Sequence, residues 1–315
     1  MKAYVLYSGG LDSILAIKLM QQQKIPLKAV HFTTPFFDRS EFCKKVAFEE
    51  GFELEVRDLG EEYIRMLRSP KHGYGSCMNP CLDCHIIMLQ ELSKMAKGGF
   101  IVTGEVLGQR PISQKSGDFE LIEKELGLEG KILRPLSAKL LPETEAEKEG
   151  IVDRSRLYGI SGRQRNIQFR LARKFAVEYL TPAGGCLLTE KEYSHKLKDL
   201  LEHKENLSVG ELKLLKKGRH FQFGKNKIIV GRNEQENHEL EKMKAPEDFL
   251  FEAEGISPIS ILSGPKTKEA IEMAAKLTLM YSDEESAAVK YGKNYENKIS
   301  VEKPERTDME KFRII

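Results

Sequence analysis

The 315-residue sequence has no tryptophan, only five cysteines and no long apolar run. Without such a run, an ordinary membrane-spanning helix is excluded. No signal peptide is recognisable either, so we expect a cytoplasmic protein without a membrane partner. Five cysteines in such a protein are more typical of metal binding or catalysis than of a disulfide framework. The formal net charge is only +2, so binding of nucleic acid would need a local basic patch.

The order of apolar segments predicts an α/β protein with two domains, at about 1–190 and 205–315. In the first domain, strands alternate with helices, which indicates a doubly wound parallel sheet. The predicted strands are 3–7, 27–33, 53–58, 100–103 and 132–136. The predicted helices begin at Leu11 and cover 40–51, 61–67 and 82–97.

The stretch SGGLDS, residues 8–13, lies where the first predicted strand ends and a helix begins. Its two glycines let the backbone turn sharply and approach a ligand closely. The helix N-terminus presents unpaired N–H groups and a positive dipole to a phosphate, and Ser8 and Ser13 add hydroxyl donors. The alternative is an ordinary turn with Ser8 or Asp12 as the N-cap. A Walker loop is excluded because no lysine follows the glycines.

SGGLDS closely resembles the PP-loop, S-G-G-x-D-S, of the ATP pyrophosphatase family. The resemblance implies a HUP-like fold that binds ATP with Mg²⁺. It also implies cleavage of ATP to AMP and pyrophosphate, which adenylates a carbonyl-type oxygen. The residues that it places at the phosphates are Ser8, Gly9, Gly10, Leu11, Asp12 and Ser13. Asp12 is the predicted catalytic residue among them and would position Mg²⁺ or water.

Two further loops follow the second and fourth strands, namely TTPF (33–36) and TGEVLGQRPISQ (103–114). Ligands bind beyond the carboxyl ends of parallel strands, so we expect three loops to build one nucleotide site. TGEVLGQRPISQ resembles a segment of tRNA 4-thiouridine synthases that closes over the nucleotide. The alternative is a loop whose glycines serve only its structure. The ATP contacts predicted in these loops are Thr33, Thr103, Gly104 and Gln109.

Three cysteines gather in CMNPCLDCH, and Cys186 follows two glycines in PAGGCLL. The C-x-x-C spacing of Cys81 and Cys84 is typical of zinc and iron–sulfur sites. One hypothesis is a cluster, and a second is a structural zinc ion held by Cys77, Cys81, Cys84 and Cys186, with His85 in reserve. A third is a metal-free pair that carries and resolves a persulfide. Inert buried cysteines are the remaining alternative.

A C-x-x-C pair with one distant cysteine resembles the pattern of cluster-dependent tRNA thiolases. In those enzymes three cysteines hold a [4Fe–4S] cluster whose fourth iron is open to sulfide. The resemblance implies that Cys81, Cys84 and Cys186 are the ligands and catalytic residues. Cys77 would be a spare, a fourth ligand or a persulfide carrier. Cys43, alone in SEFCKKVAF, is predicted to lie in a helix core.

Residues 153–174 form the local basic stretch of the nearly neutral chain. Arginine binds phosphate bidentately, so we predict that this stretch binds the RNA backbone with a steep salt dependence. The alternative is a solvated helix face, the usual role of a charge run. The predicted RNA contacts are Arg154, Arg156, Arg163, Arg165, Arg170 and Arg173.

After residue 190 the sequence predicts a smaller α+β domain, with a hairpin at 220–232 that turns at KN. Asn233 is expected to cap a helix over 234–243. A further strand is expected over 249–262, and a second helix over 267–282. Over roughly 210–303 these segments resemble the NFACT-R segment of ribosome-associated quality-control proteins. Glu252 departs from that family, which usually has a histidine there; a dimerisation or lid module is the alternative.

The resemblances together imply an ATP-dependent tRNA sulfurtransferase, a thiouridine synthase that replaces a uridine oxygen with sulfur. Its expected partners are tRNA and a sulfur donor, either sulfide or a persulfide carrier, and a homodimer stays open. One alternative is an ATP-dependent amide-forming ligase with a structural zinc ion. Another is a non-catalytic RNA-binding quality-control factor.

Overall fold

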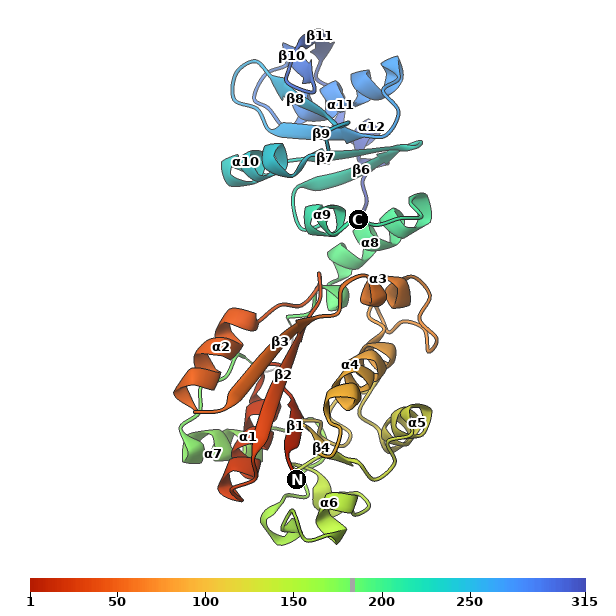
Figure 1. The fold of residues 1–315 in the computed structure, drawn as a ribbon. Helices are drawn as coiled ribbons and strands as arrows, with labels where there is room; N and C mark the ends of the chain where they lie inside the picture. Colours follow the sequence, from red (N-terminus) through yellow and green to blue (C-terminus); the bar gives the residue numbers. More distant parts are fainter. Residues whose placement is uncertain (182–184) are drawn as a thin grey trace. The chain divides into compact units, whose positions relative to one another are not determined.

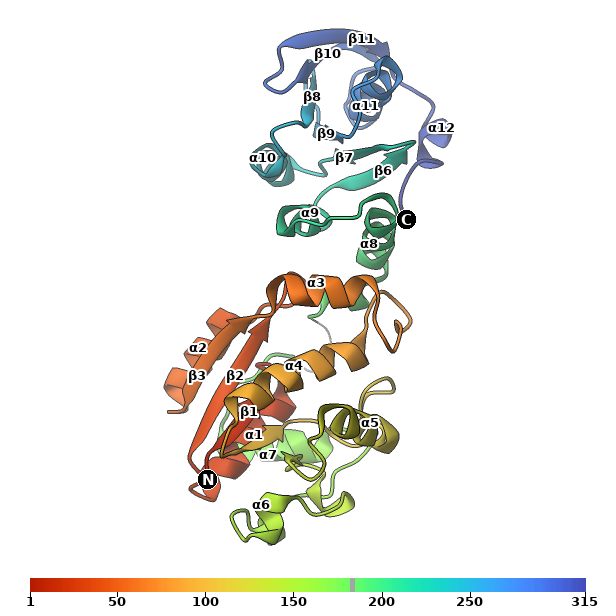
Figure 2. The same cartoon turned by 45° about the vertical axis from the view of Figure 1, so that its right-hand side comes forward.

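The computed structural model describes residues 1–181 and 185–315, which form two compact units, Met1–Thr189 and Glu190–Ile315. Figure 1 and Figure 2 show the ribbon of each unit from two sides. In the described part of the chain, no helix combines the length and apolarity needed to cross a membrane.

The first unit is an α/β unit in which strands and helices alternate along most of its length. Its strands are β1 (Ala3–Leu6), β2 (Leu27–Thr33), β3 (Glu53–Asp58), β4 (Phe100–Thr103) and β5 (Ile132–Leu133). Its helices are α1 (Leu11–Gln22), α2 (Ser40–Glu49), α3 (Gly60–Arg68), α4 (Cys81–Met95), α5 (Ser116–Leu126), α6 (Glu145–Lys148) and α7 (Asn166–Phe175).

The five strands pair in parallel in the order β3-β2-β1-β4-β5. Helices α1, α2 and α7 cover one face of the sheet, and α4 lies on the other with α3 and α5 beside it (Figure 1, Figure 2). β1 and β4 are short, apolar strands because both faces of the sheet are covered. The predicted doubly wound parallel sheet is thus confirmed.

The strand order reverses between β1 and β4, which is the topological switch point of the sheet. β1 connects to β2 on one side, whereas β4 and β5 lie on the other. The loops after β1 and β4 therefore leave the sheet at adjacent carboxyl ends, which is where open α/β sheets bind ligands. SGGLDS follows β1 and TGEVLGQ follows β4, so the topology brings these two segments together.

The second unit contains a six-stranded antiparallel sheet. Its strands are β6 (Arg219–Phe223), β7 (Asn226–Val230), β8 (Phe249–Ala253), β9 (Ile259–Ser263), β10 (Ser286–Gly292) and β11 (Asn297–Glu302). Its helices are α8 (Lys191–His203), α9 (Val209–Leu214), α10 (Glu234–Met243), α11 (Lys268–Met280) and α12 (Arg306–Glu310).

The strand order is β11-β10-β8-β9-β7-β6. α11 packs across one face through a large apolar cluster, and α9 and α10 pack over a smaller cluster that includes Leu214 and Leu240. The predicted cap is confirmed, because Asn233 Oδ1 accepts the N–H of Glu236 at 2.9 Å. The single strand predicted over 249–262 is wrong: it divides into β8 and β9, because residues 254–258 turn the chain back.

The turn of the first hairpin also differs from the prediction. Gly224 and Lys225 make the turn. Asn226 is already the first residue of β7 and pairs with Phe223 of β6. Gly224 supplies the left-handed backbone that the turn needs, with φ of 55°. The KN pair is therefore displaced by one residue from the true turn.

Candidate functional site

The turn between β1 and α1 leaves its backbone open at the carboxyl end of the sheet. Gly10 is the N-cap of α1 and has no side-chain cap, so neither Ser8 nor Asp12 plays that role. Gly9 has φ of 71°, and a Cβ there would lie 3.0 Å from the Cys43 sulfur. The glycine is thus required both by conformation and by close packing. Cys43 itself is buried in α2, as predicted.

The two serines of the turn hold each other and the helix start in place. The buried Ser13 hydroxyl donates to the Gly10 carbonyl at 2.9 Å and accepts the Ser8 N–H at 3.3 Å. The two hydroxyl oxygens lie 3.2 Å apart. These hydrogen bonds hold the turn in place, so the free N–H groups of the first turn of α1 are presented from a rigid backbone. Such an arrangement suits an anion.

Asp12 lies in the first turn of α1 with one oxygen bonded and the other buried without a partner. Its Oδ2 accepts a hydrogen bond from Gln109 at 2.7 Å, whereas Oδ1 has no partner within the described residues. Burial raises the pKa of Asp12, and the amide of Gln109 and the guanidiniums of Arg165 and Arg110 oppose that rise. A buried carboxylate oxygen without a donor is suited to a cation.

The loop after β4 contacts the start of α1 through its backbone. A Cβ at Gly104 would lie 2.5 Å from the Ser13 nitrogen and 2.6 Å from the Asp12 carbonyl carbon. Only glycine allows the two loops to approach this closely. The glycine predicted here from the sequence thus joins the two halves of the site.

Glu105, the residue after Gly104, is a fully buried carboxylate with several donors. Arg134 Nε donates to it at 3.0 Å, Thr103 Oγ1 donates at 3.0 Å, and His85 Nδ1 lies 2.7 Å away. Burial alone would raise the pKa of Glu105, but Arg134 and His85 outweigh burial and hold it at about 2. Glu105 is therefore ionised at neutral pH and fixes the His85 ring beside the cysteines.

One cavity of about 250 Å³ brings most of the predicted site together. The predicted residues that line it are Ser8, Gly10, Leu11, Asp12, Ser13, Cys81, Cys84, Thr103, Gly104, Arg165 and Cys186. Among its described lining residues Gly9, Thr33 and Gln109 are missing, since Gln109 lies behind Asp12 and Thr34 takes the place of Thr33. Sequence reasoning missed Arg110 and Glu105, although both lie in the TGEVLGQRPISQ segment that it singled out.

Two of the three cysteines at this cavity accept hydrogen bonds from side chains. Tyr63 Oη donates to Cys84 Sγ at 3.4 Å, and Asn79 Nδ2 donates to Cys81 Sγ at 3.1 Å. Burial raises the pKa of Cys84 to about 12; the Tyr63 hydroxyl lowers it, and the negative charges of Cys186 and Cys81 raise it further. The three sulfurs thus lie within electrostatic reach of one another.

The side chains around this cavity include donors of the kind that bind metals. Three cysteine thiols around one buried site are the donor type that an iron–sulfur cluster or a zinc ion binds, once they are deprotonated. Within residues 1–181 and 185–315, no three His, Cys, Asp or Glu side chains form a group that could hold a metal ion. Cys77 does not appear among the described lining residues, so three thiols rather than four face the cavity.

The arginines of the basic stretch have different surroundings. Arg154 pairs with Glu147 at 2.7 Å and donates to the Leu141 carbonyl, and Arg156 donates to the Gln22 carbonyl at 2.8 Å. These two arginines therefore make intramolecular contacts that hold their own loops. Arg163, Arg170 and Arg173 are exposed, the last two on α7. Arg165 precedes α7 and lines the cavity near Asp12.

Comparison with known protein families identifies part of the second unit. Residues 218–313 match the family model for the NFACT protein RNA binding domain. The matched segment, here called the NFACT-R segment, runs from just before β6 to just after α12. A search of curated proteins finds no match.

Three solved structures show a distant likeness to the chain. The first is a predicted subunit of tRNA methyltransferase from Methanocaldococcus jannaschii, with 17% identity and a TM-score of 0.34, covering 43% of this chain and 67% of that one. The second is the U34-tRNA thiolase NcsA from Methanococcus maripaludis with its [4Fe-4S] cluster, with 16% identity, a TM-score of 0.35, and 69% and 73% covered. The third is a 4-thiouridine synthetase–RNA complex with bound ATP, with 19% identity, a TM-score of 0.35, and 55% and 50% covered. At such scores the likeness carries no argument about function.

Proposed function

We propose that this protein is an ATP-dependent tRNA thiolase, which adenylates a uridine carbonyl and replaces its oxygen with sulfur. One observation carries the proposal: Cys81, Cys84 and Cys186 line the same cavity as the phosphate-binding turn of residues 8–13. Activation by ATP and delivery of sulfur need to meet at one carbon atom. A cavity that joins a phosphate site to three thiols supports that combination.

The proposed ATP site uses the backbone more than the side chains. The N–H groups at the start of α1 and the hydroxyl of Ser8 would bind the β- and γ-phosphates, while the Ser13 hydroxyl holds the turn through the Gly10 carbonyl. The unpartnered Oδ1 of Asp12 would hold Mg²⁺, which shares the phosphate charge. Arg110 and Arg165 line the same cavity and would neutralise the remaining negative charge. Positioning and charge neutralisation are the rate contributions expected of such a site.

The proposed reaction has two steps. First, the uridine carbonyl oxygen attacks the α-phosphorus of ATP, the bond from that phosphorus to the bridging oxygen breaks, and pyrophosphate leaves. Second, a sulfide sulfur adds to the activated ring carbon and AMP leaves with the former carbonyl oxygen. ATP, uridine and sulfide thus give thiouridine, AMP and pyrophosphate, and no atom changes oxidation state overall. The base would leave its stack to reach the cavity.

The three thiols are proposed to manage the sulfur. Cys81, Cys84 and Cys186 match the ligands of a [4Fe–4S] group in donor type and number, but the described residues form no metal-holding group as they stand, so the three thiols would have to draw together to hold one. When bound, such a group would supply sulfur delivery from an iron without a protein ligand. A zinc site with four thiol ligands has less support, because three thiols face the cavity; a zinc ion there would take His85, which also lines the cavity, as its fourth ligand. The metal-free alternative keeps the same thiols and uses one as a persulfide carrier. Sulfide is the matching donor for the cluster, whereas the metal-free carrier would take its outer sulfur from a persulfide protein by exchange.

RNA is the proposed second substrate. The exposed arginines on α7 lie in the same unit as the cavity and would hold the RNA backbone. The NFACT-R segment supplies a second region whose family description is RNA binding. Both regions would be sensitive to salt, because phosphate contacts release counterions.

The decisive test is thiolation of unfractionated tRNA, with ATP, Mg²⁺ and sulfide, under anaerobic conditions. Nucleosides would be separated and identified by mass spectrometry to detect 4-thiouridine or 2-thiouridine. The amount of AMP formed would be compared with the amount of thiouridine. We expect one AMP per thiouridine with the unaltered protein, and no thiouridine with Cys81→Ser or Cys186→Ser. Cys77→Ser is the matched control and should keep activity if three thiols suffice. Thiolation that survives both Cys81→Ser and Cys186→Ser would refute the proposal.

A spectrum of the anaerobically purified protein separates the three sulfur hypotheses. A broad brown absorption with iron and acid-labile sulfide, lost in Cys81→Ser, would support the cluster. One zinc per colourless chain would make the thiols structural and favour the ligase. A colourless, metal-free protein would favour persulfide chemistry.

A further inference from the structure

Four arginines and one tyrosine converge at one corner of the second unit. Arg219 opens β6, Arg232 follows β7, and Tyr281 follows α11. Arg306 begins α12, and Arg313 lies in the segment after it. We call these five residues the arginine–tyrosine cluster. All five lie within the NFACT-R segment.

The last residues of the chain complete the cluster by pairing with the edge of the sheet. Arg313 forms an antiparallel bridge with Phe221 of β6. The N–H of Gln222 donates to the Phe312 carbonyl at 2.8 Å, and the N–H of Ile314 donates to the His220 carbonyl at 2.9 Å. These backbone bonds cover the outer edge of β6 and fix Arg313 beside it. The cluster is thus built by tertiary structure from segments almost 100 residues apart.

Tyr281 holds two guanidinium groups against its ring. The guanidinium carbon of Arg219 lies 4.2 Å from the ring centroid, and that of Arg306 lies 5.9 Å away. Arg219 Nη1 also donates to the Gly231 carbonyl at 3.0 Å. A guanidinium stacked on a ring and anchored by one N–H keeps its other donors in a fixed plane. The Arg219 side chain is therefore preorganised rather than loose.

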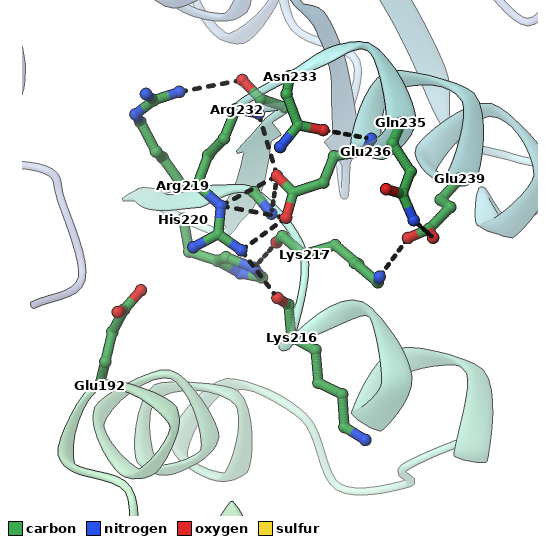
Figure 3. Close-up of polar contacts among 12 residues, drawn as sticks. Glu192, Lys216, Lys217, Arg219, His220, Arg232, Asn233, Gln235, Glu236 and Glu239 are labelled. Carbon is green, nitrogen blue, oxygen red and sulfur yellow. Dashed lines mark hydrogen bonds and ion pairs between the residues drawn. The ribbon is translucent and has the colours of Figure 1, made fainter.

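Two carboxylates balance part of the positive charge. Figure 3 shows Glu236 accepting from Arg232, with Nη2 and Oε1 2.6 Å apart. Glu310 accepts from Arg306 Nε at 3.2 Å and from Arg313 Nη1 at 3.1 Å. Four guanidiniums thus face two carboxylates.

Glu192 is the third carboxylate nearby, and its charge is already paired with that of Lys196. It lies on α8 within electrostatic reach of Arg232 and Arg313, and it pairs with Lys196 at 2.7 Å. In the described part of the chain, Arg219 makes no ion pair with a carboxylate. Burial lowers the pKa of Arg219, and Arg313 and Arg232 lower it further, whereas Tyr281 and Glu236 oppose that fall. The cluster therefore holds like charges together without full compensation, and a polyanion would relieve that repulsion.

We propose that the arginine–tyrosine cluster is the surface with which the second unit binds RNA. The guanidiniums contact successive phosphates, and Tyr281 positions Arg219 for a bidentate contact. The inference rests on the proposed function, in which RNA is a substrate, and adds the surface that holds it. Arginines from separate segments match a chain of repeated phosphates better than a single anion.

The test is fluorescence anisotropy of labelled, unfractionated tRNA titrated with the full chain at several salt concentrations. The first variant is Arg306→Gln with Arg313→Gln. We expect its Kd to rise about 10-fold or more at 0.1 M salt, and the slope of log Kd against log salt to fall by about 1 to 2. The matched control is Lys290→Gln with Lys298→Gln, on β10 and β11 at the opposite edge of the sheet. The control should change Kd less than about 2-fold.

Three further variants separate a binding role from a structural one. Tyr281→Phe keeps the ring and should bind RNA like the unaltered protein, whereas Tyr281→Leu should raise Kd about 5-fold. Arg219→Gln should lower the salt slope by about 1. Thermal unfolding of each variant shows whether it folds. If Arg219→Gln is unfolded, the double variant of Arg306, which is 68% exposed, and Arg313 decides the question.

Each outcome tells for or against the proposal. A double variant that folds and binds tRNA as tightly as the unaltered protein would overturn this surface and leave RNA binding itself intact. Equal losses in the lysine control, or equal competition by polyglutamate, would overturn it in favour of a general charge effect. An unaltered protein that binds no tRNA would refute the proposed function itself. Loss confined to Arg170→Gln with Arg173→Gln would place RNA on the first unit alone.

Discussion

The side-chain amide of Gln109 donates a hydrogen bond of 2.7 Å to the carboxylate of Asp12. It thereby joins the loop after β4 to the first turn of α1. Behind it, Gln168 Nε2 on α7 donates to Gln109 Oε1 at 3.1 Å. Because Gln168 occupies the oxygen of the Gln109 amide, the NH₂ group of that amide faces Asp12. Three elements far apart in the sequence thus orient one carboxylate.

The first prediction concerns this relay. Gln168→Leu removes the donor to Gln109 Oε1 and lets the Gln109 amide turn its oxygen toward Asp12. We expect the KM for ATP to rise about 10-fold with a smaller change in kcat, since one hydrogen bond to a charged group is at stake. Pyrophosphate release at varied ATP measures both constants. The exposed Gln164→Leu, four residues earlier, is the control, and an unchanged KM in Gln168→Leu would show that the relay is dispensable.

The second prediction separates the catalytic and structural effects of Asp12. Asp12→Asn should lower ATP turnover at least about 100-fold, because the anionic oxygen proposed for Mg²⁺ is lost. Burial raises the pKa of Asp12 in the folded protein, so its ionisation costs stability as the pH rises from about 3.8 through the raised pKa. The Asn variant lacks this cost. We therefore expect its Tm at pH 7 to equal or exceed that of the unaltered protein, with the difference shrinking toward pH 4. A lower Tm at pH 7 would contradict this account.

The third prediction concerns the approach of Gly104 to α1. In Gly104→Ala the new Cβ meets the Ser13 nitrogen and the Asp12 carbonyl carbon, which are backbone atoms and cannot rotate away. We expect a loss of about 1–3 kcal/mol in stability and weaker binding of ATP, measured by urea unfolding and by calorimetric titration. Gly117→Ala is the matched control, since a Cβ there meets nothing within 4 Å. Equal behaviour of the two variants would mean that the two loops can move apart freely.

The fourth prediction uses the buried carboxylate of Glu105. Its pKa of about 2 lies below the ordinary value of 4.5, so it contributes stability above pH 4.5 that is lost as the pH falls toward 2. Glu105→Gln should cost about 3 kcal/mol at pH 7, because Arg134 stays buried with one carboxylate partner fewer. The gap to the unaltered protein should narrow at pH 3 in urea unfolding. The exposed Glu61→Gln should show no gap at either pH, and a gap that widens in acid for Glu105→Gln would reverse the assignment.

Local pattern was enough for much of the fold and failed in identifiable places. β2, β3 and β4 have the predicted ends because each is an apolar or alternating run bounded by turn residues. α5 was missed, and β10 and β11 were not recognised as strands. Val289 and Val301 become core residues only because α11 packs on them. Such burial depends on packing between distant segments rather than on local preference.

The sequence by itself determined the strand, turn and helix around SGGLDS, because glycine conformation and apolar periodicity act over a few residues. Tertiary structure decided which distant residues meet there. The parallel sheet brings the loops after β1 and β4 to one end, and chain packing adds Cys186 and Arg165 to the same cavity. It also gathered Arg219, Tyr281 and Arg313 into one surface. Neither encounter is encoded in spacing along the chain, since both depend on strand order and long-range pairing.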